Sequence, residues 1–209
     1  MSNLLKIASV LLSILTINTA KTHESGIRQI DFRNFSYPWD NTVATVPLNW
    51  RWITTSSHGK IRLIDGRHDF FNPRASEIER KLSPSLEFHF VTYGDLDGDQ
   101  IEEAAIALNY STGGTANWDY LYVYKFEHGA AKLVGRLESG SRADGGLIQV
   151  SIRNGLLIVD FADSERRVAD CCSEGFIRVH YRWRNGRFIE EGPRERGDLK
   201  SNVRPLADL

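Results

Sequence analysis

The sequence has only two cysteines among its 209 residues, and these are neighbours, Cys171 and Cys172. Across a trans peptide their Cα atoms lie about 3.8 Å apart, below the usual disulfide range of roughly 4.4 to 6.8 Å. Three arrangements are open: a strained vicinal disulfide, an intermolecular disulfide and a buried reduced pair. Zinc is a poor fit, because chain neighbours cannot complete a tetrahedral shell without further ligands. We predict a Cys171–Cys172 disulfide, which an oxidising compartment favours.

Long hydrophobic runs are also lacking, except for one near the N-terminus. Lys6 precedes an apolar run over residues 7–17, and small polar residues lead to Ala20. This is the layout of a signal peptide over residues 1–20, cleaved after Ala20. An uncleaved anchor is the alternative, although the run is shorter than the roughly 20 residues that a membrane-spanning helix needs. Either way, we expect a periplasmic or secreted protein, with no transmembrane segment after signal removal.

An excess of charge of one sign is absent as well. Without residues 1–20, the chain has 25 basic and 27 acidic residues, a net charge of about −2. This balance argues against general nucleic-acid binding. The remaining length suits one domain with a real core. We expect a single β-rich domain over residues 21–191, followed by a polar, loose C-terminal tail over residues 192–209.

The sequence contains no familiar catalytic motif. G-x-S-x-G, H-E-x-x-H, P-loop and C-x-x-C patterns are all missing, and the six histidines are scattered. An enzyme would therefore need groups that only the fold brings together. The candidates for such a hydrolase are His180, Asp144 and Asp119. The glycine pairs near these aspartates are more typical of turns than of a pocket.

What the sequence does have is a series of strand-like segments rich in β-branched and aromatic residues, at 27–37, 46–54, 60–64 and 86–93. We also interpret IEEAAIALNY as a strand, because it follows a tight acidic turn. Asn154-Gly155 and Asn185-Gly186 lie between alternating apolar runs and predict type I′ hairpins. His128-Gly129 predicts a third hairpin. The fold class is therefore mainly β, an antiparallel meander forming a sandwich or a single curved sheet.

One short helix is expected over residues 74–82 (RASEIERKL). Pro73 stands before it as a starter, and Pro84 stands beyond it as a stop. The IEEAAIALNY segment could also be read as a helix, because periodicity cannot separate short apolar runs, but its position after the acidic turn favours a strand.

The segment GDLDGDQIEEA is the part of the sequence richest in closely spaced carboxylates. Asp95, Asp97 and Asp99 alternate, Ile101 can offer its carbonyl, and Glu103 follows at position nine. Calcium prefers six to eight oxygen ligands, and carboxylates at alternate positions of a tight turn converge on one point. The sequence therefore predicts a calcium site. The alternative is a polar turn whose acids are simply solvated.

This loop is not an EF-hand, because position six is Gln100 rather than glycine and position twelve is Ile106 rather than glutamate. Its spacing resembles the DxDGDxxxE loops of FG-GAP and related β-repeat proteins, in which a strand follows directly. Gln100 is a poor residue for the left-handed position that a glycine would take.

The segment FIRVHYRWR also alternates. Ile177, Val179, Tyr181 and Trp183 should face the core, which leaves a basic stripe on the other side of the strand. The members of this basic stripe are Arg178, His180, Arg182 and Arg184. It is either an ordinary solvated face or a docking surface for an anionic envelope polymer or an acidic protein.

Four blocks, taken in order, carry a family resemblance: GDLDGDQIEEAAIAL, GGTANWDYLYVY, GSRADGGLIQV and ADCCSEGFIRVHYRWRNGRF. Over roughly residues 27–191 the chain resembles uncharacterised bacterial secreted proteins and lipoproteins of the LppP/LprE type. Here Ser173 follows the cysteine pair where that family typically has proline, and the lipoprotein cysteine is missing. The resemblance implies an extracytoplasmic domain and supplies no catalytic residues.

Two functions remain. The first is a non-enzymatic, calcium-stabilised binding or envelope module, and the second is an extracytoplasmic hydrolase. A deep pocket with a converging acid and base would favour the enzyme, and a flat basic sheet would favour binding.

Overall fold

The computed structural model describes residues 26–39, 51–53, 59–70, 74–169 and 171–199. The expected signal peptide, its cleavage site at Ala20 and the end of the tail lie outside these ranges, as does most of the strand expected at 46–54. Within the described ranges, no helix is both long enough and apolar enough to cross a membrane.

The centre of the fold is a six-stranded antiparallel sheet in the order β2-β8-β7-β6-β5-β4. Its strands are β2 (Arg51–Ile53), β4 (Arg67–Asp69), β5 (Ser85–Gly94), β6 (Glu103–Ser111), β7 (Asn117–Glu127) and β8 (Ala130–Glu138). Strands β5 to β8 follow one another along the chain and pair with their sequence neighbours. This is the meander that the turn signals predict, and the IEEAAIALNY segment forms most of β6.

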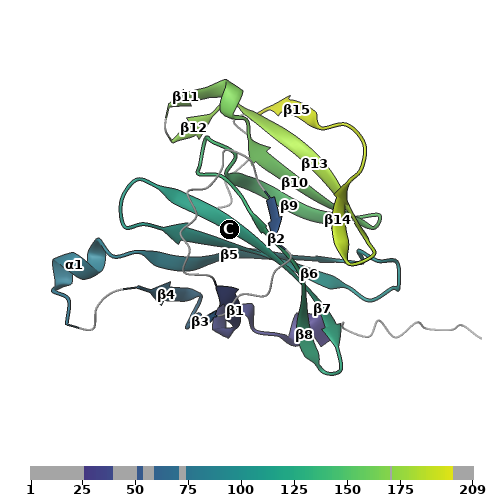
Figure 1. The fold of residues 1–209 in the computed structure, drawn as a ribbon, viewed down its shortest axis with the longest axis horizontal. Coiled ribbons are helices and arrows are strands. Elements are labelled where there is room, and N and C mark those ends of the chain that lie inside the picture. Colours follow the sequence, from purple (N-terminus) through teal and green to yellow (C-terminus); the bar gives the residue numbers. More distant parts are fainter. Residues whose placement is uncertain (1–25, 40–50, 54–58, 71–73, 170, 200–209) are drawn as a thin grey trace, which may run out of the picture.

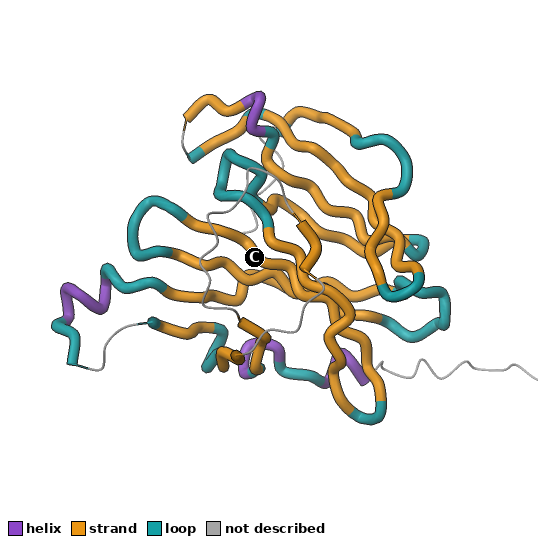
Figure 2. The backbone as a smooth tube through the Cα atoms, in the orientation of Figure 1, coloured by secondary structure: helices purple, strands orange, loops and turns teal. Residues whose placement is uncertain are grey.

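A second antiparallel sheet has the order β14-β13-β10-β9, and β15 also pairs with β13. Its strands are β9 (Leu147–Arg153), β10 (Leu156–Ala162), β13 (Gly175–Arg184), β14 (Arg187–Glu190) and β15 (Glu195–Asp198). There are also two small ladders in the described residues, β1 (Ser36–Trp39) with β3 (Gly59–Arg62) and β11 (Arg167–Ala169) with β12 (Cys172–Ser173). Strands dominate the backbone (Figure 2), so the prediction of a mainly β, antiparallel fold is confirmed.

Each face of the six-stranded sheet carries its own hydrophobic core. One face packs against the second sheet through residues such as Leu121, Val123, Val159 and Phe161. The other face is covered by the N-terminal segment, whose Tyr37 packs against residues of the sheet such as Tyr122. The fold is therefore layered, with the six-stranded sheet in the middle (Figure 1). Burial on both faces explains why β6 reads as an almost unbroken apolar run.

All three expected hairpin turns are present. Asn154-Gly155 joins β9 to β10, Asn185-Gly186 joins β13 to β14, and His128-Gly129 joins β7 to β8. Both residues of each pair have positive φ, between 50° and 80°. This is the backbone that a type I′ turn requires, and it favours glycine at the second position.

The N-terminal prediction is wrong in part. A strand was expected over residues 27–37, but most of that segment forms two 3-10 helices, η1 (Gly26–Gln29) and η2 (Phe32–Asn34). The Asp31 carboxylate accepts hydrogen bonds from the backbone N–H groups of Arg33 and Asn34 and so caps η2. Local capping by Asp31 outweighs the β propensity of this aromatic-rich segment.

The helix is shorter than expected. α1 covers Glu77–Lys81, and its N-cap is Ser76 rather than a residue next to Pro73. Ser76 and Glu79 form a capping box, in which each side chain accepts a hydrogen bond from the backbone of the other. The Ser-x-x-Glu spacing outweighs the proline as the start signal. A third 3-10 helix, η3 (Ser164–Arg166), precedes β11.

The expectation of a loose tail from residue 192 is wrong for β15. Strand β14 pairs only with residues 181–184 of β13, which leaves the first half of that long strand open. Glu195–Asp198 fills this edge by pairing with residues 175–178. The segment lacks an apolar pattern because it is a mostly exposed edge strand, so sequence periodicity could not reveal it.

Candidate functional site

The acidic loop, residues 95–103, lies where the two sheets converge, on the right in Figure 1. It connects the end of β5 to the start of β6. Gly94 allows this convergence, because a Cβ at that position would lie 2.6 Å from a side-chain carbon of Ile152 on β9. The loop is thus held against the β9–β10 hairpin at a point where only glycine fits.

Three aspartates gather in the acidic loop. Asp95, Asp97 and Asp99 each offer one carboxylate oxygen, and these oxygens all lie within 4.8 Å of one another. Asp95 is half-buried, and the other two are exposed. None of the three belongs to an ion pair within the described part of the chain. Such a group could hold a metal ion, although exposed acidic groups are common without one.

The loop backbone is tightly wound around these carboxylates. Asp95 accepts hydrogen bonds from the backbone N–H groups of Gly98, at 2.7 Å, and Gln100, at 3.0 Å. Asp99 accepts one from Ile101 at 2.7 Å. Gln100 has φ 68°, so it occupies the left-handed conformation despite its side chain. The predicted geometry therefore forms even with the unfavourable residue.

Glu103 is the first residue of β6 and is almost completely buried, with 3% of its surface exposed. It is not one of the three acids whose oxygens converge. One of its oxygens, Oε2, accepts a hydrogen bond from the Leu96 backbone N–H at 2.7 Å. The other, Oε1, is buried without a hydrogen-bond partner in the described structure. Burial raises the pKa of Glu103 to about 7, and repulsion from Asp97, Asp99 and Asp95 adds to this effect.

The neighbouring Glu102 provides a contrast. It accepts a 2.8 Å hydrogen bond from Nη2 of Arg28, and this ion pair lowers its pKa. Asp97, by contrast, has a raised pKa because it is partly desolvated and lies beside Asp99. Of these two adjacent glutamates, Glu102 is therefore neutralised by Arg28, whereas one oxygen of Glu103 has no partner among the described residues.

An open groove of about 690 Å³ runs beside the acidic loop. It is lined by residues 95–98 of the loop, residues 152–155 of the β9–β10 hairpin and residues 182–184 at the end of β13. The groove thus places two aspartates opposite three arginines and one tryptophan. It lies directly beside the aspartate cluster, two of whose members line it.

The core side of β13 is as predicted for Val179 and Tyr181, which are buried, and for Ile177, which packs against the same core. The prediction is wrong for Trp183, which is half-buried and lines the groove. The arginines of the basic stripe, on the other side, are paired within the sheet. Arg178 donates two hydrogen bonds of 2.8 Å to Asp160, which lies directly across from it on β10. Arg182 donates a 2.7 Å bond to Glu191, and Arg184 donates one of 3.3 Å to the same carboxylate. The stripe is therefore not the free cationic surface that the alternation suggested.

The three hydrolase candidates have separate partners in the fold. Asp119 is buried and accepts hydrogen bonds from the Asn109 side chain and the Leu147 backbone. Asp144 forms an ion pair with Arg167 at 2.9 Å, and His180 lies on β13 opposite Ile158. Within the described residues, no hydrogen bond joins any two of Asp119, Asp144 and His180. The described part of the chain therefore offers no acid–base pair among them for hydrolysis.

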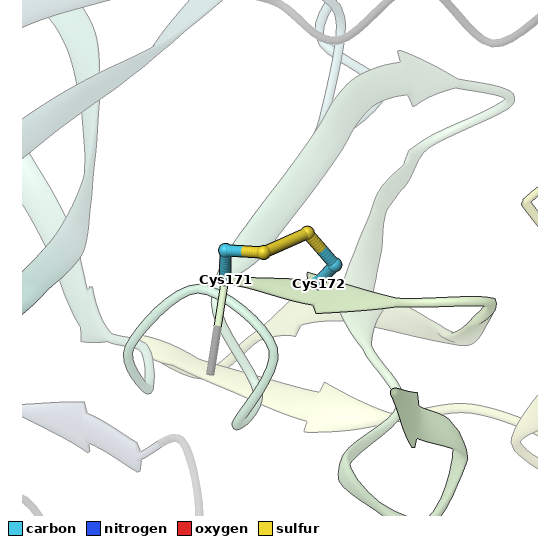
Figure 3. Close-up of a disulfide and its surroundings, with 2 residues drawn as sticks. All are labelled: Cys171 and Cys172. Carbon is cyan, nitrogen blue, oxygen red and sulfur yellow. A yellow bond between two sulfur atoms is a disulfide. The ribbon is translucent and has the colours of Figure 1, made fainter. Parts of the chain in front are cut away.

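The cysteine pair is joined as predicted. Cys171 and Cys172 form a vicinal disulfide at the start of β12, and both residues are exposed (Figure 3). The described residues include no free cysteine. The disulfide lies on the small β11–β12 ladder, and none of the residues lining the groove belongs to this ladder.

Sequence reasoning did not predict two residues that line the groove. Arg153 was not singled out, and Trp183 was expected to face the core. The Asn-Gly turn signalled the hairpin that carries Arg153, but nothing in the sequence placed that hairpin beside the acidic loop.

A scan against protein-family models found no match to this chain, and searches of curated proteins and of solved structures found none either.

Proposed function

We propose that the protein works outside the cytoplasm as a non-enzymatic binding module whose acidic loop holds one calcium ion. The ligands would be Asp95, Asp97, Asp99, the carbonyl of Ile101 and Glu103. The observation that carries this proposal is the convergence of three aspartates in the loop, whose charges act on Glu103, a buried residue with one oxygen that has no partner among the described residues. A buried polar atom without a partner costs about 1–3 kcal/mol, and a cation would remove that cost.

Calcium suits this donor set better than other cations. All of the ligands are oxygens, and they come from one short loop, so waters must complete a shell of six to eight. Magnesium demands a stricter octahedron, and zinc favours nitrogen and sulfur ligands. A site built from one loop and several waters should be weak, with a Kd of roughly 10⁻⁴ to 10⁻³ M, as in extracellular modules.

Export to the periplasm or the medium is part of this proposal. It rests on the signal-peptide layout of residues 1–20, and a millimolar calcium concentration would there load even a weak site. The vicinal disulfide is compatible with an oxidising compartment. The binding partner would be an anionic envelope polymer or an acidic protein. Because the basic stripe is internally paired, the groove is the better-placed surface for it.

Thermal unfolding with calcium and with a chelator tests the proposal, on the parent and on Asp97→Ala. At millimolar calcium, the parent should gain about 1–2 kcal/mol, following RT ln(1 + [L]/Kd). Asp97→Ala should lose most of this gain. Equal melting temperatures under all four conditions would contradict calcium binding and show that the loop is a solvated acidic turn.

A further inference from the structure

We propose that the groove binds a carboxylate-bearing saccharide, such as a uronic-acid unit of an anionic polysaccharide. This inference rests on the proposed calcium site and names the ligand class of the groove beside it. The ring would pack on Trp183, the carboxylate would pair with Arg153, and ring hydroxyls would replace waters on the calcium ion. Three features of the groove carry this assignment.

The first feature is an uncommitted cation. Arg153 lies on the groove wall at the end of β9 and is exposed. Unlike those of Arg182 and Arg184, which both pair with Glu191, its guanidinium has no ion-pair or hydrogen-bond partner among the residues that the structure describes. A guanidinium presents a planar fork of donors that matches a carboxylate. Arg153 is therefore able to take an anionic group from a ligand.

The second feature is an aromatic surface next to that cation. Trp183 lines the groove and is only half-buried, and its ring contacts Phe188 on β14 with centroids 4.8 Å apart. This contact holds the indole in place, so little conformational entropy is lost when a ligand binds. The axial hydrogens of a pyranose ring form an apolar face that packs on such an amphipathic ring.

The third feature is the acidic wall itself. Asp95 and Asp97 line the groove and also belong to the aspartate cluster. A calcium ion there would offset two of the negative charges of the aspartate cluster and so weaken the repulsion that this wall exerts on an anion. Its water-filled positions accept oxygen ligands, and vicinal hydroxyls of a sugar supply these. A mixed site of cation, aromatic ring and hydroxyl-binding metal fits an acidic sugar better than a bare phosphate chain, which has no ring for Trp183.

Isothermal titration calorimetry of the full mature chain tests this inference. The probe is the hyaluronan tetrasaccharide, which alternates glucuronate with N-acetylglucosamine, and chitotetraose is the neutral control. At millimolar calcium the hyaluronan probe should bind, and chitotetraose should bind at least tenfold more weakly. Replacing calcium with a chelator should also weaken binding of the hyaluronan probe at least tenfold.

Variants then locate the site. Arg153→Gln and Trp183→Ala should each weaken binding of the probe about tenfold or more. This is the loss of affinity expected when one charged or stacking contact is removed. Trp183→Phe should recover part of the affinity, which separates stacking from a folding defect. Arg187→Gln is the matched control, because Arg187 is exposed at the start of β14 and does not line the groove.

The outcomes separate this inference from the calcium site. Calcium binding by the parent without binding of the tetrasaccharide would overturn the groove assignment and leave the proposed function standing. The groove assignment also fails if Arg153→Gln and Trp183→Ala bind like the parent, or if polyglycerol phosphate binds as tightly and independently of Trp183. Absence of calcium binding would overturn both proposals, and saccharide binding unchanged by chelator would overturn the role given to calcium.

Discussion

Charges of one sign gather both in the acidic loop and in the basic stripe, and the surroundings of the two differ. Along the stripe, each arginine has an acidic partner: Asp160 for Arg178, and Glu191 for Arg182 and Arg184. In the loop, three aspartates lie within 4.8 Å of one another, and none has an ion-pair partner among the described residues. Lys125 attracts Asp97 and Asp99, but its ion pair is with Glu127.

This difference separates structural charge from charge that awaits a partner. A cross-strand pair such as Arg178 and Asp160 satisfies both groups and holds two strands in register. Gathered carboxylates beside a buried, half-satisfied Glu103 do the opposite, because they store repulsion that a cation would relieve. Sequence alternation marked the two segments equally. Only their partners distinguish them.

The largest expected effect concerns Glu103 without calcium. Its pKa of about 7 lies above the ordinary 4.5, so the folded state holds a proton that the unfolded state releases between these values. Stability in chelator should therefore fall as pH rises from about 4.5 to about 7, by on the order of 3 kcal/mol. Urea unfolding across this range measures the slope. Glu103→Gln should flatten the pH dependence of stability. An unchanged slope in that variant would contradict the assignment of this pH dependence to the buried Glu103 carboxylate.

The next effect concerns the paired region. Arg178→Ala would leave the nearly buried Asp160 carboxylate unpaired. Breaking a buried pair costs roughly 3–5 kcal/mol, and the partial exposure of Arg178 reduces this to about 2–3 kcal/mol. Arg184→Ala is the control, because both it and Glu191 are well exposed and the loss should stay below about 0.5 kcal/mol. Similar losses in chemical denaturation of the two variants would contradict a special role for the Arg178–Asp160 pair.

The smallest effect concerns the loop backbone. Gln100 adopts φ 68°, a conformation that suits glycine better. Gln100→Gly should raise stability by up to about 1 kcal/mol, because relief of backbone strain exceeds the added entropy of the unfolded chain. Gln149→Gly on β9 is the matched control, and it should destabilise because glycine weakens a strand. A melting temperature lowered equally in both variants would show that Gln100 is not strained.

Much of the fold could be predicted where the signal is local. The Asn154-Gly155 and Asn185-Gly186 pairs specify turns by their own backbone preferences, and both hairpins formed. The alternating aspartates likewise converge because they belong to one tight loop. Side-chain capping was the local signal that the prediction overlooked, behind strand propensity near Asp31 and behind the proline start signal near Ser76. Asp31 and Ser76 direct η2 and α1, and both have the residue types expected at an N-cap.

The remaining features depend on contacts distant in sequence. Strand β15 forms because β14 leaves half of β13 open, a fact about strand lengths that Glu195–Asp198 itself does not encode. The groove brings Asp97, Arg153 and Trp183 together from three segments that no sequence spacing relates. The ion pairs of the basic stripe are of the same kind, since Asp160 is visible as a partner only once β10 and β13 are in register.

Direct calcium binding at neutral pH tests the central claim, by equilibrium dialysis on the parent, Asp97→Asn and Asp65→Asn. Asp65→Asn removes one acidic charge from an exposed turn with positive φ, where asparagine is equally tolerated, and so controls for net charge. We predict one ion per chain for the parent and for Asp65→Asn, with at least tenfold weaker binding for Asp97→Asn. No saturable binding to the parent, or equal binding by Asp97→Asn, would contradict a calcium site in the acidic loop.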